Sequence, residues 1–279
     1  MDLVIQAPEI PGALLSSVAA MAGAQGITAL HDAGVQAYRL PRTQSRAGVA
    51  EFCAAAGIDC AFVPPELERR RVRVVALDMD STLITIECID EIADMLGIKR
   101  EVAAITAATM RGEIDFRESL IRRVALLAGL PVTALDRVYD ERLELSPGAE
   151  RMLAGFTAVG ARTLLVSGGF TYFTDRLRAR LGFDETASNT LEIVDGRLTG
   201  RLSGDIVDAQ VKAARLKTLK DRVCTGGGIA VAIGDGANDL PMFQAADVSV
   251  AYHAKPVVRA RATFALDHCG LDALLNLFR

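Results

Sequence analysis

The sequence predicts an α/β fold built on a parallel sheet, with an inserted helical bundle and a small N-terminal α/β unit. Four apolar, β-rich runs predict buried core strands: VRVVAL at 72–77, TLLV at 163–166, IAVAI at 229–233 and VSVA at 248–251. Helical patterns separate these runs, and strands that alternate with helices form parallel sheets with right-handed crossovers. Runs without polar alternation suit strands that are buried on both faces.

Two insertions interrupt this alternation. About 80 residues separate the first core strand from the second, and the stretch at about 85–145 is helical in pattern. We expect a helical cap over the carboxyl edge of the sheet, with helices at 88–96, 99–110, 116–127 and 132–143. Asp195-Gly196, set between alternating residues at 191–202, predicts a small β-hairpin.

The first 71 residues read as a unit of their own, ahead of a main domain at 72–279. Strands are expected at 2–5, 35–40 and 60–63, and helices at 11–26 and 46–57. Two prolines then end the pattern, and the charged ELERRR stretch that follows is interpreted as a solvated linker.

Composition limits the functional classes. The chain is 51% hydrophobic with a net charge of -4, which gives no reason to expect a nucleic acid or a membrane as partner. Five cysteines without a CxxC pair suggest reduced thiols, not a disulfide framework or a zinc site. Three scattered histidines suggest no metal site, and the acidic N-terminus does not resemble a signal peptide. We therefore expect a cytoplasmic protein.

Two carboxylates, Asp78 and Asp80, follow the first predicted core strand. Ligands bind beyond the carboxyl ends of the strands in open α/β sheets, so both side chains are expected to face one pocket. One carboxylate can attack phosphorus to form an aspartyl-phosphate, while the other gives a proton to the leaving oxygen. Taken alone, the pair also suits an acidic turn that caps a helix at Ser81.

The second core strand ends in Ser167, Gly168 and Gly169. A serine followed by two glycines exposes a hydroxyl and backbone N–H groups at the start of the helix predicted at 170–181, which is a geometry that binds phosphate oxygens. A simple tight turn explains the same residues equally well.

The third core strand ends in GDGAND at 234–239, which places Asp235 and Asp239 among small residues. Two such carboxylates suit a hard cation with oxygen ligands, although a capped helix after a glycine turn is the alternative. Lys212 lies on a helix predicted at 208–220, where a lysine is usually solvated.

Taken together and in this order, the four motifs resemble those of the haloacid dehalogenase superfamily of phosphohydrolases, whose core is a Rossmann-like sheet. Further stretches are similar to the bacterial phosphoserine phosphatase family: DMDSTLITIECIDEIA, MRGEIDFRESLIRRV, VSGGF, GDIVDAQVKA and GDGANDLPM. This resemblance implies hydrolysis of O-phospho-L-serine to L-serine and phosphate, the last step of serine biosynthesis, with Mg²⁺ as cofactor.

The resemblance also implies roles for the residues of the core. Asp78 is then the nucleophile, and Asp80 is the acid that protonates the serine oxygen and later activates water. Asp78, Asp235 and the backbone carbonyl of Asp80 bind magnesium, while Asp239 acts from behind them. The phosphate is held by Ser167, Gly168, Lys212 and Asn238.

Substrate choice is expected in the cap. Glu87 can pair with the ammonium group of the substrate, and Arg123 can bind its carboxylate in a bidentate manner. Met110 and Phe116 are expected to form an apolar wall that closes over the site. Without the resemblance, Glu87 and Arg123 would be interpreted as solvated helix charges, as we expect for Arg122.

Several alternatives remain open. The N-terminal unit is compatible with a shortened ACT-like regulatory domain, but no ligand constellation is visible, so packing or dimer formation is favoured over effector binding; a homodimer is a hypothesis. Other substrates, such as phosphothreonine or phosphohomoserine, differ by single carbon groups worth only about 1–3 kcal/mol. A phosphotransferase and an amino-acid sensor with a vestigial core are the further alternatives.

Overall fold

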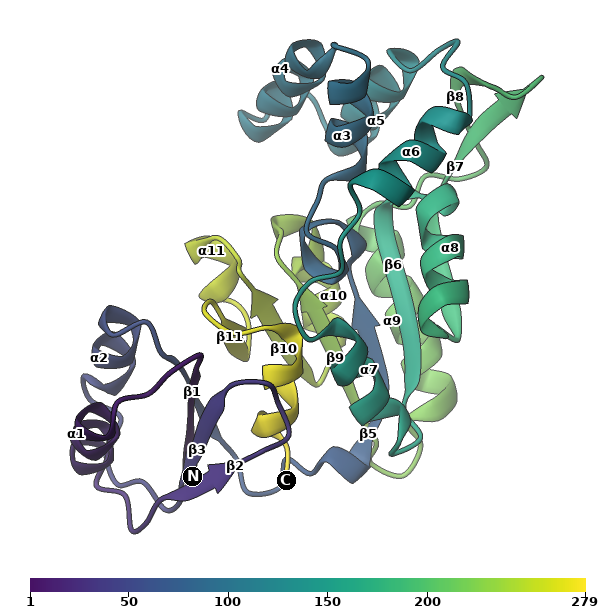
Figure 1. The fold of residues 1–279 in the computed structure, drawn as a ribbon. Coiled ribbons are helices and arrows are strands. Elements are labelled where there is room, and N and C mark those ends of the chain that lie inside the picture. The colour runs from purple at the N-terminus through teal and green to yellow at the C-terminus, as the bar shows by residue number, and fades with distance from the viewer.

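The computed structural model describes all 279 residues and contains two sheets, of which the larger carries the predicted core strands (Figure 1). Its neighbouring strands are parallel except for the last pair. The prediction of a parallel sheet is therefore confirmed. The strand order is β11 (Phe264–Leu266), β10 (Val248–Tyr252), β9 (Ile229–Gly234), β5 (Val72–Leu77), β6 (Arg162–Phe170), β7 (Glu185–Val194) and β8 (Arg197–Ser203).

Helices cover both faces of this sheet, which explains the continuous apolar sequence of its central strands. In β5, Val75 and Leu77 belong to one hydrophobic cluster, while Val74 and Ala76 belong to another on the opposite face. The first face is covered by α7 (Ala149–Thr157), α8 (Thr171–Leu181) and η4 (Leu271–Leu277), the second by α9 (Ala209–Val223), α10 (Leu240–Ala245) and α11 (Pro256–Arg259).

The inserted bundle stands beyond the carboxyl end of the sheet, as predicted (Figure 1). Two linkers connect the bundle to the sheet; the first contains Ile84 and the second contains Leu145. These two residues form a β-bridge that pairs the linkers. The hairpin at Asp195-Gly196 is also confirmed. The four cap helices are α3 (Cys88–Met95), α4 (Lys99–Met110), α5 (Phe116–Ala125) and α6 (Thr133–Glu141).

The N-terminal unit contains one strand more than the sequence predicts. Its sheet has the order β2-β3-β1-β4 and is antiparallel throughout. The missed strand is β2, whose three residues are too few to show a period of two. The elements are β1 (Asp2–Ala7), α1 (Gly12–Ala22), β2 (Thr28–Leu30), β3 (Gln36–Leu40), α2 (Val49–Ala55) and β4 (Asp59–Val63).

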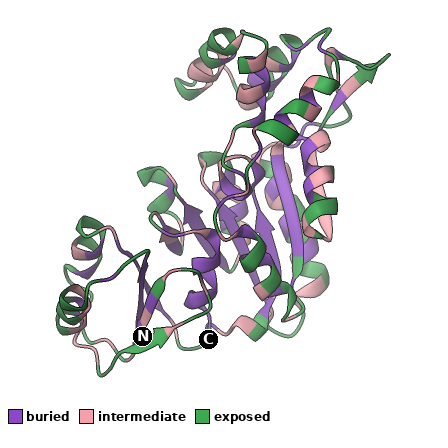
Figure 2. Ribbon diagram, viewed as in Figure 1, coloured by how far each residue is buried: buried purple, intermediate pink, exposed green.

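Both faces of the smaller sheet are covered, so β1 is buried along its whole length (Figure 2). Leu3 and Ile5 pack with the cluster beneath α1 and α2, whereas Val4 belongs to the large cluster that contains Leu274 and Phe278. The unit is thus packed onto the C-terminal segment of the chain. The chain leaves it through a helical turn at Arg69–Arg71, directly before β5, and the domain boundary at residues 71 and 72 stays a prediction.

Candidate active site

A buried lysine between two carboxylates forms the centre of the candidate site. Lys212 Nζ lies 2.7 Å from Asp78 Oδ2 and 2.9 Å from Asp239 Oδ1. All three side chains are buried. Although burial alone would lower the pKa of Lys212, the two carboxylates raise it above its usual value, so the ammonium group stays charged. The interpretation of Lys212 as a solvated helix residue is excluded.

Local structure explains how these groups meet. Asp78 follows β5 and its carboxylate accepts a hydrogen bond from the Met79 N–H at 2.7 Å. Lys212 lies in the first turn of α9, which Asp208 caps by accepting hydrogen bonds from the N–H groups of Gln210 and Val211. The strand end and the helix start therefore bring opposite charges together.

Three carboxylates at this edge have the spacing of a cation site. Oxygen atoms of Asp78, Asp235 and Asp239 all lie within 4.8 Å of one another. Burial and the charge of Asp78 raise the pKa of Asp235, and the same causes raise that of Asp239 to about 7. Carboxylate oxygens are the ligands that hard divalent cations take, and such a cation would offset this excess of negative charge.

The oxygens of Asp235 and Asp239 are not equally free. Asp239 uses Oδ1 for Lys212 and Oδ2 for the N–H of Gly236 at 3.1 Å. Asp235 Oδ1 accepts a hydrogen bond from the Thr82 hydroxyl at 3.1 Å, and no hydrogen bond engages its other oxygen. The arrangement favours Asp235 as a direct ligand and Asp239 as a support.

Asp80 lies between the core and the cap. Its Oδ1 accepts a hydrogen bond from the Cys88 N–H at 2.9 Å, and its Oδ2 accepts one from Ser167 Oγ at 3.3 Å. Burial, with the nearby charge of Asp78, raises the pKa of Asp80 to about 6. Ser81, which follows Asp80 on the way to the cap, adopts the left-handed conformation with φ 54°, and this turns the chain sharply after the strand.

The stretch Ser167–Gly169 continues β6 as extended backbone and faces Asp80. A Cβ atom on Gly169 would lie 2.7 Å from Asp80 Oδ2 and 3.1 Å from Ser167 Oγ, so glycine permits this close approach. The Gly169 N–H donates a hydrogen bond to Ser167 Oγ at 2.8 Å.

Asn189, a buried residue of β7, supports this stretch and was not predicted from the sequence. Its Nδ2 donates to the carbonyl oxygens of Gly168 at 2.8 Å and Gly169 at 3.3 Å, and its Oδ1 accepts from the Val207 N–H at 2.8 Å. Asn189 thus joins the serine–glycine stretch to the segment that leads into α9. No local pattern in the sequence marks it, because its partners are distant along the chain.

Glu87 and Arg123 both come from the cap. Glu87 accepts a hydrogen bond from Ser81 Oγ at 2.6 Å. Although the Glu87 side chain is accessible to solvent, the protein atoms around its carboxylate and the charge of Asp80 raise its pKa to about 8. Arg123 is half-buried, and the charges of Asp90 and Glu87 act on it, while its neighbour Arg122 is exposed and paired with Glu118.

The remaining predicted residues differ in their placement. Asn238 Nδ2 lies 3.4 Å from Asp78 Oδ2, at the centre of the site. Phe116 is partly buried, and a Cβ atom on Gly168 would lie 3.0 Å from its ring. Met110 is 68% exposed, so in this arrangement it does not pack into the apolar wall expected of it.

All five cysteines are free thiols. None of the helices combines the length and the apolar character needed to cross a membrane.

A parallel α/β sheet with a helical cap inserted after its first core strand, above an aspartate–lysine centre, defines a class of capped hydrolases. The chain belongs to the haloacid dehalogenase-like hydrolases, whose family model matches residues 75–244. It is 53% identical to a phosphoserine phosphatase from Polaromonas sp. (strain JS666), over 80% of this chain and 97% of that protein.

Solved structures agree with this assignment. The unliganded crystal structure of a probable phosphoserine phosphatase from Vibrio cholerae superimposes with a TM-score of 0.84 at 36% identity, covering 99% of this chain and 85% of that one. A substrate-bound phosphoserine phosphatase complex has a TM-score of 0.68 at 32% identity, covering 75% of this chain and 99% of that one. The superposition on the Vibrio cholerae structure includes the N-terminal sheet.

Proposed function

We propose that this chain is a phosphoserine phosphatase, which hydrolyses O-phospho-L-serine to L-serine and phosphate. The observation that carries the proposal is the buried Lys212–Asp78 pair, with Asp80 beside it and with Glu87 and Arg123 above it on the cap. The core groups suit phosphoryl transfer, and the cap groups suit the ammonium and carboxylate of an amino acid. The Polaromonas relative and the substrate-bound structural neighbour described above are phosphoserine phosphatases.

In the first step, a carboxylate oxygen of Asp78 attacks phosphorus and the bond between phosphorus and the serine oxygen breaks. Asp80 gives its proton to that oxygen, so L-serine leaves as a neutral alcohol. In the second step, Asp80 takes a proton from water, the water oxygen attacks phosphorus, and the bond to Asp78 breaks. Asp80 thereby recovers its proton and Asp78 its carboxylate.

Charge compensation is the main contribution of the protein to such a reaction. Lys212 lies 2.7 Å from Asp78 Oδ2 and offsets the repulsion between this carboxylate and the phosphate dianion. Ser167 Oγ and the N–H groups of the glycine stretch can donate to phosphate oxygens, and Asn238 Nδ2, 3.4 Å from Asp78 Oδ2, offers a further donor.

The residues present fit a magnesium ion. Asp78, Asp235 and the backbone carbonyl of Asp80 would hold it, with Asp239 fixing Lys212 and the loop behind them. When bound, Mg²⁺ supplies positive charge that offsets the charge of the phosphoryl oxygens and of the buried carboxylates.

The two neighbouring arginines of α5 test the substrate assignment. Arg123→Ala is expected to lower kcat/KM for phosphoserine about a hundredfold, because a bidentate partner of the substrate carboxylate is lost. Hydrolysis of p-nitrophenyl phosphate, which has no carboxylate, should change less than about threefold.

Arg122→Ala is the matched control, since Arg122 is exposed and pairs only with Glu118. It should leave both activities at the wild-type level. Equal losses for both substrates in Arg123→Ala, or no loss for either, would contradict the role of Arg123 in substrate choice.

A further inference from the structure

A carboxylate of the N-terminal sheet is bound by backbone N–H groups of the main domain, in the loop that follows β11. Asp59, at the start of β4, is 4% exposed. Its two oxygens accept hydrogen bonds from three consecutive N–H groups, those of Asp267 at 2.8 Å, His268 at 3.1 Å and Cys269 at 3.0 Å. Charge-assisted bonds of this kind are stronger than neutral ones, so Asp59 fixes the loop 267–270.

The same loop contacts the second linker of the cap, which contains Leu145, at Pro147. The Leu271 N–H donates a hydrogen bond to the Pro147 carbonyl oxygen at 2.7 Å. A Cβ atom on Gly270 would lie 2.6 Å from that oxygen, so only glycine allows the loop to approach so closely. The residue before Pro147, Ser146, donates its N–H to the Leu83 carbonyl oxygen at 2.9 Å.

These contacts adjoin the paired linkers, which we call the hinge of the cap. The two linkers pair at Ile84 and Leu145, and the Thr85 N–H donates to the Glu144 carbonyl oxygen at 3.0 Å. These two linkers are the covalent connections between the cap and the sheet, so their pairing is one of the contacts that set the cap angle. The cap also touches the sheet through a bridge between Pro131 and Arg197 of the β7–β8 hairpin.

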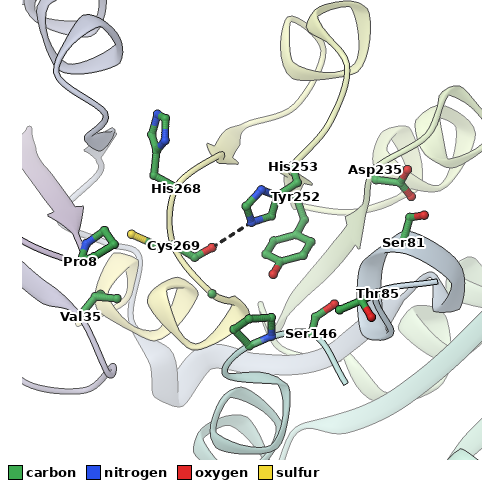
Figure 3. Close-up of a pocket in the computed structure, with 12 residues that line it drawn as sticks. Pro8, Val35, Ser81, Thr85, Ser146, Asp235, Tyr252, His253, His268 and Cys269 are labelled. Carbon is green, nitrogen blue, oxygen red and sulfur yellow. Dashed lines mark hydrogen bonds between the residues drawn. The ribbon is translucent and has the colours of Figure 1, made fainter. Parts of the chain in front are cut away.

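A cavity of about 660 Å³ shows how close the parts lie (Figure 3). Val35 reaches it from the N-terminal unit, Thr85 and Ser146 from the two linkers, and Asp235 from the candidate cation site. His253 lines it as well, with its ring 3.3 Å from the carbonyl oxygen of Cys269 in the loop held by Asp59. The N-terminal unit, the hinge and the site thus share one space.

We infer that Asp59 is a positioning residue through which the N-terminal unit sets the angle of the cap hinge and thereby aligns Glu87 and Arg123 with the reacting phosphate. Asp59 touches no reacting atom and acts through loop 267–270 and Pro147. The inference rests on the proposed function, since a substrate that the cap reads is needed to report the alignment in kinetics.

Two variants test the path from Asp59 through loop 267–270 to Pro147, one at each end of it. Asp59→Asn keeps the shape of the side chain but places an amide donor against the backbone N–H groups of the loop. Gly270→Ala leaves Asp59 intact and pushes the loop away from Pro147. Both should lower kcat/KM for phosphoserine about tenfold, as small displacements of substrate-positioning groups do, with p-nitrophenyl phosphate hydrolysis changed less than about twofold.

Arg39→Met is the matched control. Arg39 is also buried at the junction of the two parts, but its guanidinium donates to the carbonyl oxygens of Asn276 at 2.8 Å and Phe278 at 3.4 Å, not to the loop. The variant should loosen the junction and lower Tm while leaving the ratio of the two activities unchanged. A merely structural role of Asp59 would give the same pattern as Arg39→Met and would overturn the inference.

Hydrogen exchange measured by mass spectrometry makes the test independent of the substrate. Peptides that contain Thr85, Ser146 and Leu271 should exchange faster in Asp59→Asn than in the wild type, and at the wild-type rate in Arg39→Met. If wild-type protein hydrolyses p-nitrophenyl phosphate but not phosphoserine, the proposed substrate fails and the exchange rates alone decide on the hinge. Unchanged exchange at the linkers in Asp59→Asn would overturn the inference in either case.

Discussion

Asp78→Asn is expected to reduce phosphate release from phosphoserine by at least about a thousandfold, because an amide nitrogen or oxygen does not replace a carboxylate as nucleophile. The substitution conserves shape, and the amide oxygen can still accept the hydrogen bond from the Met79 N–H. The fold should therefore persist. Phosphate release by freshly purified variant, measured in the presence of magnesium, checks this prediction.

Asp221→Asn is a suitable control, since Asp221 is exposed near the far end of α9 and away from its capped start. It should retain wild-type activity. Activity that survives in Asp78→Asn would contradict the aspartyl-phosphate route, provided that mass spectrometry excludes deamidation back to aspartate.

Lys212→Met is expected to have two large effects at once. Activity should fall about 10²–10³-fold, because a preorganised positive charge beside the nucleophile is lost. The free energy of unfolding should fall by about 3–5 kcal/mol, because the buried carboxylates of Asp78 and Asp239 lose the cation between them. Steady-state kinetics measures the loss of activity. Guanidinium unfolding in the absence of added metal measures the change in the free energy of unfolding.

Lys217→Met on the same helix provides the comparison, because Lys217 is exposed. Its kinetics and unfolding should match those of the wild type. A Lys212→Met protein that unfolds at the wild-type guanidinium concentration would contradict the view that Lys212 neutralises two buried charges.

The larger sheet shows which parts of the fold could be predicted from sequence. Its central strands are buried on both faces and therefore read as continuous apolar runs, as in β5 and β9. Two strands gave no such signal: β11 has three residues, and the first half of β7, ETASNT, is polar and mostly half-buried, with Asn189 as its one buried residue. The sequence predicts the hairpin at Asp195-Gly196 but not that β7 extends the sheet.

The site was predictable where residues follow strand ends and not where they act across distance. Asp78 and Asp235 lie at strand ends, so their convergence follows from the topology of a parallel sheet. The burial of Lys212 could not follow from its helix, because periodicity does not show which face of α9 meets the strand ends. Asn189 and Asp59 bind backbone groups far along the chain, and such contacts leave no local pattern.

The central claim is the hydrolysis of phosphoserine, and the most direct test compares substrates with wild-type protein. We would measure kcat/KM for O-phospho-L-serine, phosphothreonine and p-nitrophenyl phosphate, with magnesium and with EDTA. The account predicts that phosphoserine is the best substrate and that EDTA abolishes release from all three. Release from p-nitrophenyl phosphate without release from phosphoserine would contradict the assigned substrate, and full activity in EDTA would contradict the cation site at Asp78 and Asp235.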